Sequence, residues 1–218
     1  MRMHYLKRFS VTGSVCPSTS IFGERAAVEV SKMAAEHDRV VVAGVGSGVV
    51  ASRILRHLPD AVFVECDPRF AARFAERHPD ARIVVDKVQN LYVHEPALRH
   101  QRLLLASFIP TAGSFYSDDL ARMFVSICRS GGSVIQMRYL PHQMSARFFD
   151  GLRERGIVSR RCFTVARNLP PVSMYALRSL LAPVHSSLVP KPVLGTAAQL
   201  HPAIGHAAGP RQAARAAR

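Results

Sequence analysis

The first clear hydrophobic pattern of the chain lies in residues 39–67. The β-branched run Val40–Val42 predicts a strand that is buried on both faces. Apolar residues then recur at helical spacing between Val49 and Leu58, and a second apolar run, Ala61–Val64, predicts the next strand. A strand, a helix and a second strand in this order are typical of a parallel βαβ unit.

The same alternation continues on both sides of this unit. Further helices are expected over Ile21–Glu36, Pro68–His78, Asp118–Cys128 and Ser145–Arg155. Further strands are expected over Ala81–Val85, Arg102–Ser107, Ser133–Tyr139, Val158–Ala166 and Val172–Leu180. Together these elements predict an α/β fold, namely a Rossmann-like, doubly wound, mostly parallel seven-stranded sheet with flanking helices.

Three glycines separate the first strand from its helix. Gly44, Gly46 and Gly48 follow the spacing G-x-G-x-G, and glycine permits positive φ angles and close approach of a ligand. The second strand ends in Glu65. This order predicts a nucleotide bound over the turn, with the acid on the ribose hydroxyls. Because residues 46–51 also read G-x-G-x-x-A, the glycines alone leave NAD open as the ligand.

Composition divides the chain into three parts. Residues 1–20 form a lead-in, and residues 21–182 form one domain that is large enough to bury a core of its own. Residues 183–218 contain no acid and four basic residues and show no hydrophobic periodicity. We expect this basic tail to be disordered.

The net charge of +14 comes mainly from arginine, because only four of the 29 basic residues are lysines. This bias reflects either GC-rich coding or a basic face for an anionic partner, lipid or nucleic acid. The lead-in mixes apolar and basic side chains, namely Tyr5, Leu6 and Phe9 with Arg2, Lys7 and Arg8. Such a mixture suits an anionic membrane surface, and it also suits a helix docked on its own domain.

Signals of a membrane-spanning or metal-binding protein are missing from the sequence. No apolar run reaches the length of a membrane span, and the first nine residues lack the apolar core of a signal peptide. The cysteines (Cys16, Cys66, Cys128 and Cys162) have no metal-type spacing, which predicts reduced thiols and no metal site. The expected location is the cytoplasm, with peripheral contact at the inner membrane face.

Four short motifs, taken in their order, resemble one family. They are G-S-V-C-P-S at Gly13–Ser18, S-F-I-P at Ser107–Pro110, G-G with Q-M-R-Y within 131–139, and N-L-P-P followed by Tyr175. They are similar to motifs of bacterial phospholipid N-methyltransferases, a branch of the class I S-adenosylmethionine (SAM) methyltransferases. The resemblance extends from about Leu6 to Arg178.

This resemblance implies SAM as the cofactor and a lipid as the substrate. The glycine turn looks like the cofactor loop, Glu65 like the acid on the ribose of SAM, and Asp86 like the acid beside its adenine. The cofactor-binding residues expected on this basis are Gly44, Val45, Gly46, Gly48, Glu65, Cys66, Asp86, Lys87 and Ser107.

Some positions depart from the family pattern. Val42 stands where the family usually has an acid near the amino group of the cofactor, and Lys87 stands where its G-D-A motif has Ala. Related RNA adenine methyltransferases have N-L-P-[YF] after the fourth strand, whereas this chain has Ser107 there and no aromatic residue after Pro110. Because an aromatic side chain usually holds the flipped base, a nucleic-acid substrate is not expected.

Methylation of an amine requires alignment with the SAM methyl group and removal of a proton. Tyr139, His142 and Tyr175 are the catalytic candidates for this proton, with Asp118 as a weaker one. The predicted function is N-methylation of phosphatidylethanolamine. Open alternatives are methylation of another lipid-like acceptor such as a fatty-acid carboxylate, SAM binding without catalysis, and a nicotinamide oxidoreductase.

Overall fold

The computed structural model describes residues 18–111, 117–141 and 145–181. Its helices are α3 (Ser20–Ala34), α4 (Ala51–His57), α5 (Pro68–Arg77), α6 (Leu91–His94), α7 (Asp118–Arg129) and α8 (Ala146–Glu154). Its strands are β1 (Arg39–Ala43), β2 (Val62–Val64), β3 (Arg82–Val84), β4 (Leu103–Ser107), β5 (Ser133–Tyr139), β6 (Ile157–Val165) and β7 (Val172–Ser179). Two 3₁₀ turns, η1 (Val88–Asn90) and η2 (Pro96–His100), flank α6.

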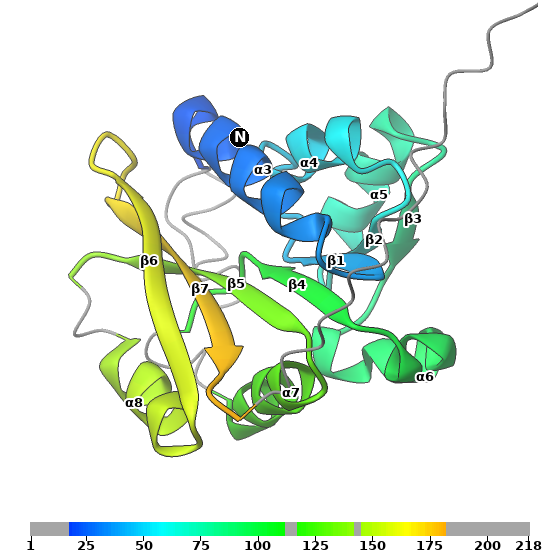
Figure 1. The fold of residues 1–218 in the computed structure, drawn as a ribbon. Coiled ribbons are helices and arrows are strands. Elements are labelled where there is room, and N and C mark those ends of the chain that lie inside the picture. The colour runs from blue at the N-terminus through cyan, green and yellow to red at the C-terminus, as the bar shows by residue number, and fades with distance from the viewer. Residues whose placement is uncertain (1–17, 112–116, 142–144, 182–218) are drawn as a thin grey trace, which may run out of the picture. The chain divides into compact units, whose positions relative to one another are not determined.

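The strands form one seven-stranded sheet in the order β3-β2-β1-β4-β5-β7-β6 (Figure 1). The strands from β1 to β5 pair in parallel, and β7 pairs antiparallel with both β5 and β6. The predicted fold class is therefore confirmed. Because the parallel strands share one direction, their carboxyl ends meet at one edge of the sheet, which is where doubly wound folds bind ligands.

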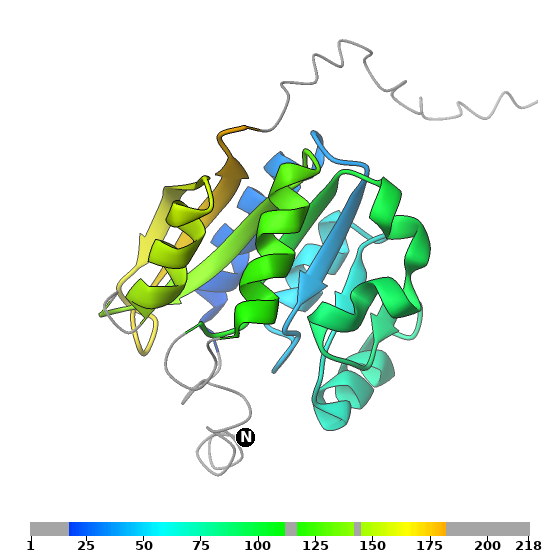
Figure 2. The same ribbon diagram turned by 90° about the horizontal axis from the view of Figure 1, so that it is seen from below.

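The sheet is covered on both faces by separate hydrophobic cores. Successive side chains of a strand point to opposite faces, so Val40 and Val42 join one core while Val41 and Ala43 join the other. The first core packs under α3, α4 and α5, and the second packs under η1, α6, η2, α7 and α8. Figure 2 views the sheet with α6, α7 and α8 in front of it and α3 behind. The two-sided burial of β1 explains its unbroken apolar sequence.

Capping residues fix the beginnings of the main helices. Thr19, Asp67 and Ser117 each accept a hydrogen bond from a backbone N–H in the first turn of α3, α5 and α7, respectively. The predicted helices end within a few residues of these observed bounds. Residues 88–100 were not predicted as helical, because turns as short as η1, α6 and η2 do not show a periodic apolar face.

Candidate active site

The glycine turn follows β1 at the carboxyl edge of the sheet. Gly44 has φ 84° and Gly48 has φ 83°, a backbone conformation that residues with a Cβ atom rarely adopt. A Cβ atom on Gly44 would lie 3.2 Å from the carbonyl carbon of Phe108, and one on Gly48 would lie 2.8 Å from Nη2 of Arg77. The turn is thus packed between the segment after β4 and the end of α5, with no side chain of its own at these two positions.

Glu65 connects the end of β2 to the glycine turn. Its Oε2 accepts a hydrogen bond of 2.8 Å from the N–H of Gly46, and its Oε1 accepts one of 2.9 Å from the N–H of Asp67. The residue is only 6% exposed. Each carboxylate oxygen retains a lone pair, so the carboxylate fits a ribose hydroxyl that approaches over the turn. The side chain also fixes the conformation of the turn.

Asp86 follows β3, and its carboxylate is bonded to groups of the next turns. Oδ1 accepts hydrogen bonds from the Lys87 N–H (2.6 Å) and from Asn90 Nδ2 (3.0 Å), and Oδ2 lies 2.8 Å from Nε2 of His94. The bond to His94, followed by the bonds to Lys87 and Asn90, lowers the pKa of Asp86. Asp86 therefore organises the segment that begins η1, and its contact with adenine stays a prediction.

Cys66 and Lys87 directly follow these two acids, and Val42 lies in the strand before the glycine turn. Cys66 is exposed, and partial burial of its thiol together with the negative charge of Glu65 raises its pKa. The thiol is therefore protonated near neutral pH and is a poor nucleophile. Lys87 is exposed, and Val42 is fully buried in the core under α3. Consequently Val42 offers no polar group for the amino end of the cofactor.

A row of polar residues crosses the sheet near its carboxyl edge. In the register of the sheet Ser107 of β4 pairs with Gln136 of β5, and Gln136 pairs with Tyr175 of β7. Alternation along each strand puts these three side chains on the α7 side. Ser107 and Gln136 are fully buried, and neither Ser107 Oγ nor Gln136 Oε1 has a hydrogen-bond partner. Buried polar atoms without partners are rare and call for a bound group or a water.

Gln136 also holds the segment that follows β4. Its Nε2 donates hydrogen bonds to the carbonyl oxygens of Ile109 (2.8 Å) and Met137 (2.6 Å). The segment with Phe108 and Ile109 is the one that packs against Gly44. Gln136 was not predicted as a site residue, although it belongs to the Q-M-R-Y motif. A glutamine in a buried apolar strand is the signal that would have identified it.

The predicted catalytic residues do not form one cluster. Tyr139 packs against the core under α3, whereas Tyr175 packs against the core under α7, so the sheet separates them. The guanidinium of Arg138 lies over the rings of Phe149 (4.4 Å) and Tyr175 (5.8 Å) on that second side. His142 lies outside the described residues. Residues 139 and 175 have opposite orientations in the sheet, so the two tyrosines could not act on the same proton, and each stays a separate candidate.

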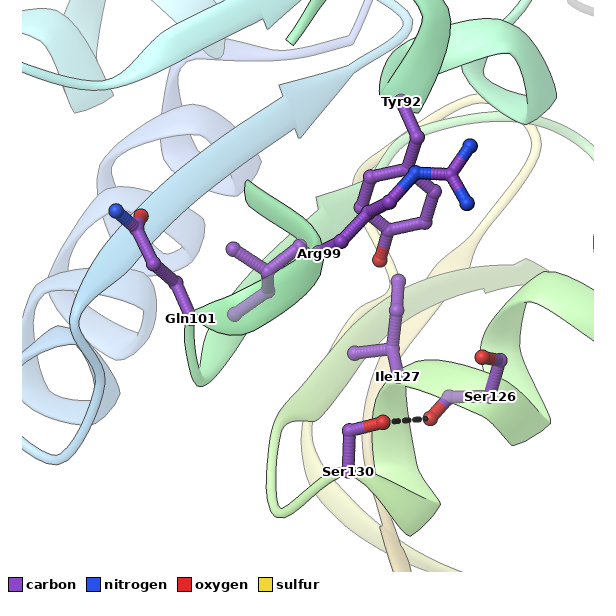
Figure 3. Close-up of a pocket in the computed structure, with 7 residues that line it drawn as sticks. Tyr92, Arg99, Gln101, Ser126, Ile127 and Ser130 are labelled. Carbon is purple, nitrogen blue, oxygen red and sulfur yellow. Dashed lines mark hydrogen bonds between the residues drawn. The ribbon is translucent and has the colours of Figure 1, made fainter. Parts of the chain in front are cut away.

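A cavity of about 260 Å³ lies at the opposite edge of the sheet (Figure 3). It is lined by Tyr92, Arg99, Gln101, Leu103, Ser126, Ile127 and Ser130. Leu103 begins β4, so this cavity is at the amino ends of the strands and contains none of the predicted site residues. The Arg99 guanidinium lies across the Tyr92 ring, 5.3 Å from its centroid. Among the described residues no cluster of potential ligands could hold a metal ion.

Comparisons with known proteins identify the fold. No protein-family model and no curated protein matches the sequence. A TehB-like SAM-dependent methyltransferase from Corynebacterium glutamicum is 16% identical, with 82% of this chain and 97% of that chain covered and a TM-score of 0.50. An rRNA methylase from Streptococcus thermophilus is 14% identical, with 71% and 94% covered and a TM-score of 0.51.

A third similar structure is the CcbJ methyltransferase from Streptomyces caelestis, which is 13% identical over 72% of this chain and 89% of that chain, with a TM-score of 0.50. The chain thus has the Rossmann-like fold that these methyltransferases share. None of the three descriptions names a lipid. Within the described residues no helix is long and apolar enough to cross a membrane.

Proposed function

We propose that this protein transfers a methyl group from SAM to the amino group of a lipid headgroup, with phosphatidylethanolamine as the preferred acceptor. The observation that carries the first half of this proposal is the bonding of buried Glu65 to the Gly46 N–H, at the carboxyl edge of a methyltransferase fold. A carboxylate held there, beside a turn without bulky side chains, suits the ribose of SAM.

SAM would supply a methyl group on a good leaving group, so the protein has mainly to bind, orient and exclude water. Gly44 and Gly48 let the turn adopt its positive φ angles and pack closely on the segment after β4 and on the end of α5. Glu65 would bind the ribose. Gln136 positions the segment after β4 through Ile109, and this segment lines the turn. These contacts support binding and orientation as the roles of these residues.

The buried polar row supports an amine as the acceptor. Gln136 Oε1 can only accept a hydrogen bond, whereas Ser107 Oγ can accept or donate one, and neither atom has a partner. An amine has N–H groups to donate to Gln136 Oε1, whereas an ionised fatty-acid carboxylate has none. The row thus favours N-methylation over carboxylate methylation. Tyr175 lies in the same row and is the candidate that we favour for accepting the proton of the amine.

The direct test is incubation of the protein with methyl-labelled SAM and a total lipid extract, followed by separation of the lipids. Label in a methylated amine headgroup supports the proposal, and label in a methyl ester favours the carboxylate alternative. A parallel reaction with total RNA covers the acceptor class of the rRNA methylase neighbour. Label only in RNA would overturn the lipid assignment, and label in neither extract would favour SAM binding without catalysis.

Cofactor binding is tested separately by calorimetry with SAM and with NAD. Glu65→Ala should weaken SAM binding by roughly 1.5–3 kcal/mol, because a charge-assisted hydrogen bond to the ribose is lost. Glu76→Ala is the matched control, since Glu76 is an exposed acid on the neighbouring α5. Binding of NAD without binding of SAM would contradict the methyltransferase assignment.

A further inference from the structure

A small surface at the carboxyl edge of the sheet combines aliphatic and basic side chains. It consists of Ile21 and Arg25 on α3 and of Arg167 and Leu169 in the β6–β7 turn, and we call it the α3–hairpin surface. Leu169 is 70% exposed and Ile21 is 48% exposed, and both arginines are exposed as well. A single exposed leucine is common on proteins, so its exposure alone does not indicate a binding surface. The surroundings of Leu169 have to supply that argument.

The turn that carries Leu169 is firmly anchored. The neighbouring Asn168 is 3% exposed, and its Oδ1 accepts a hydrogen bond of 3.0 Å from the Thr19 N–H just before α3. Its Nδ2 donates a bond of 2.7 Å to the Pro170 carbonyl oxygen. Leu169 is thus presented to solvent by a backbone fixed on both sides. Little backbone conformational entropy would therefore be lost if this side chain entered a partner.

The surface is positively charged. Arg25 donates a hydrogen bond of 3.3 Å to the Thr164 carbonyl oxygen and lies over the Phe163 ring at 5.7 Å. Neither Arg25 nor Arg167 forms an ion pair with another residue in the described part of the chain. The acids of α3 face other arginines: Glu24 pairs with Arg53 at 2.6 Å, and Glu29 with Arg160 at 3.7 Å. An anionic partner would therefore meet two guanidinium groups that no acid of the described residues neutralises.

The surface lies at the same edge as the glycine turn. Tyr139, the last residue of β5, pairs with Val172, and Val172 pairs with Val165, the last residue of β6. The β6–β7 turn continues from this point beyond the carboxyl end of β5. Figure 1 shows this turn near the start of α3, and the Thr19–Asn168 bond joins the two. A partner bound here would face the edge at which the candidate active site opens.

We infer that the α3–hairpin surface docks on a lipid bilayer that contains anionic lipid. This inference rests on the proposed function, because a headgroup acceptor has to be met at its bilayer. Aliphatic tips such as Leu169 and Ile21 insert into the interface of a bilayer, while arginines beside them are attracted to its anionic headgroups. The four residues include no aromatic side chain on which an RNA base could stack. Their chemistry therefore favours lipid over RNA.

The chain contains no tryptophan, so a single introduced tryptophan reports on its own position. In the full-length Leu169→Trp variant, vesicles of phosphatidylglycerol and phosphatidylethanolamine should shift the fluorescence emission to the blue, and added salt should reverse the shift. Vesicles of phosphatidylcholine alone should shift it much less. Leu181→Trp is the matched control, because Leu181 is a leucine with 81% exposure that follows β7 at the opposite edge of the sheet. Its emission should not change.

A charge variant tests the basic half of the surface. Arg167→Glu should lower the partition coefficient for the anionic vesicles at least about fivefold, since each basic residue near such a surface contributes about 1 kcal/mol. The affinity for SAM should remain unchanged in this variant. Leu181→Asp, which adds one negative charge at the opposite edge, should have a much smaller effect on the partition coefficient.

Three results would overturn the inference: an unchanged emission of Leu169→Trp with anionic vesicles, equal shifts for the tryptophans at 169 and 181, or a shift at 169 with RNA but not with vesicles. Transfer of labelled methyl groups to lipid in detergent micelles is measured in parallel. Binding to vesicles without methyl transfer would support the docking surface and contradict the proposed lipid methyltransferase function. Methyl transfer without a fluorescence shift in Leu169→Trp would support the proposed function and contradict the docking surface.

Discussion

Gly44 and Gly156 share a backbone conformation but have different surroundings. Their φ angles are 84° and 78°, yet a Cβ atom on Gly44 would lie 3.2 Å from the Phe108 carbonyl carbon, while one on Gly156 would have no atom within 4 Å. Gly156→Ala should lower the free energy of unfolding by about 1–2 kcal/mol, the cost of the left-handed conformation. Gly44→Ala should cost more and should also weaken SAM binding.

The measurements for this pair are urea unfolding and SAM calorimetry on both variants. Equal losses of stability, with SAM affinity preserved in Gly44→Ala, would show that the turn does not approach the cofactor. The pair separates the cost of the backbone conformation from the cost of the close contact, because only the second differs between the two sites.

Ser107 carries a buried hydroxyl without a partner, which costs about 1–3 kcal/mol of folding free energy. Replacement by alanine removes this cost, so Ser107→Ala should leave stability unchanged or raise it by up to about that amount. If the hydroxyl receives the amine of the acceptor, the same variant should lower methyl transfer. Unfolding and transfer assays together make the test. A less stable variant with full activity would assign Ser107 a structural role.

A buried histidine in the turn after α3 gives stability a dependence on pH. Burial lowers the pKa of His37 below its usual value of 6.5, despite the bond of 2.8 Å between its Nδ1 and the Met33 carbonyl oxygen. The folded state therefore binds this proton less readily than the unfolded state. The stability that His37 contributes to the folded state is therefore complete above pH 6.5. It is lost as the pH falls from 6.5 towards the lower pKa of the folded state.

Urea unfolding at about pH 7.5 and about pH 5.5 measures this contribution. The wild-type chain should be less stable at the lower pH, and His37→Gln should lose part of that difference. His78, which directly follows α5, acts in the same direction, because burial and the charge of Arg77 lower its pKa too. If His37→Gln retained the full dependence on pH, another group would be responsible for it.

The whole chain extends beyond the described residues at both ends. Residues 183–218 have no periodic apolar pattern and no acid, so deleting them should change neither the melting temperature nor the affinity for SAM. Calorimetry of the shortened chain measures both quantities. A clear drop of the melting temperature would mean that this segment contributes to the core. The proposed docking through Arg167 and Leu169 should survive the deletion.

Local sequence determined the parts of this protein whose partners are close along the chain. The run Val40–Val42, the glycines and Glu65 lie within one βαβ unit, and a pattern of that length predicts its own geometry. The bond from the Gly46 N–H to Glu65 joins the turn and the acid within this unit. Strands β1, β2 and β4 were predicted for the same reason, since burial on both faces requires continuous apolar sequence.

Tertiary structure decided what depends on the register between distant strands. Ser107, Gln136 and Tyr175 come from three separate strands, and only the pairing of β4, β5 and β7 puts them in one row. The same pairing sends Tyr139 to the other face, because shifting a strand by one residue reverses every side chain in it. Motifs can identify such residues as candidates. The strand register that brings them together or separates them cannot be read from the local sequence.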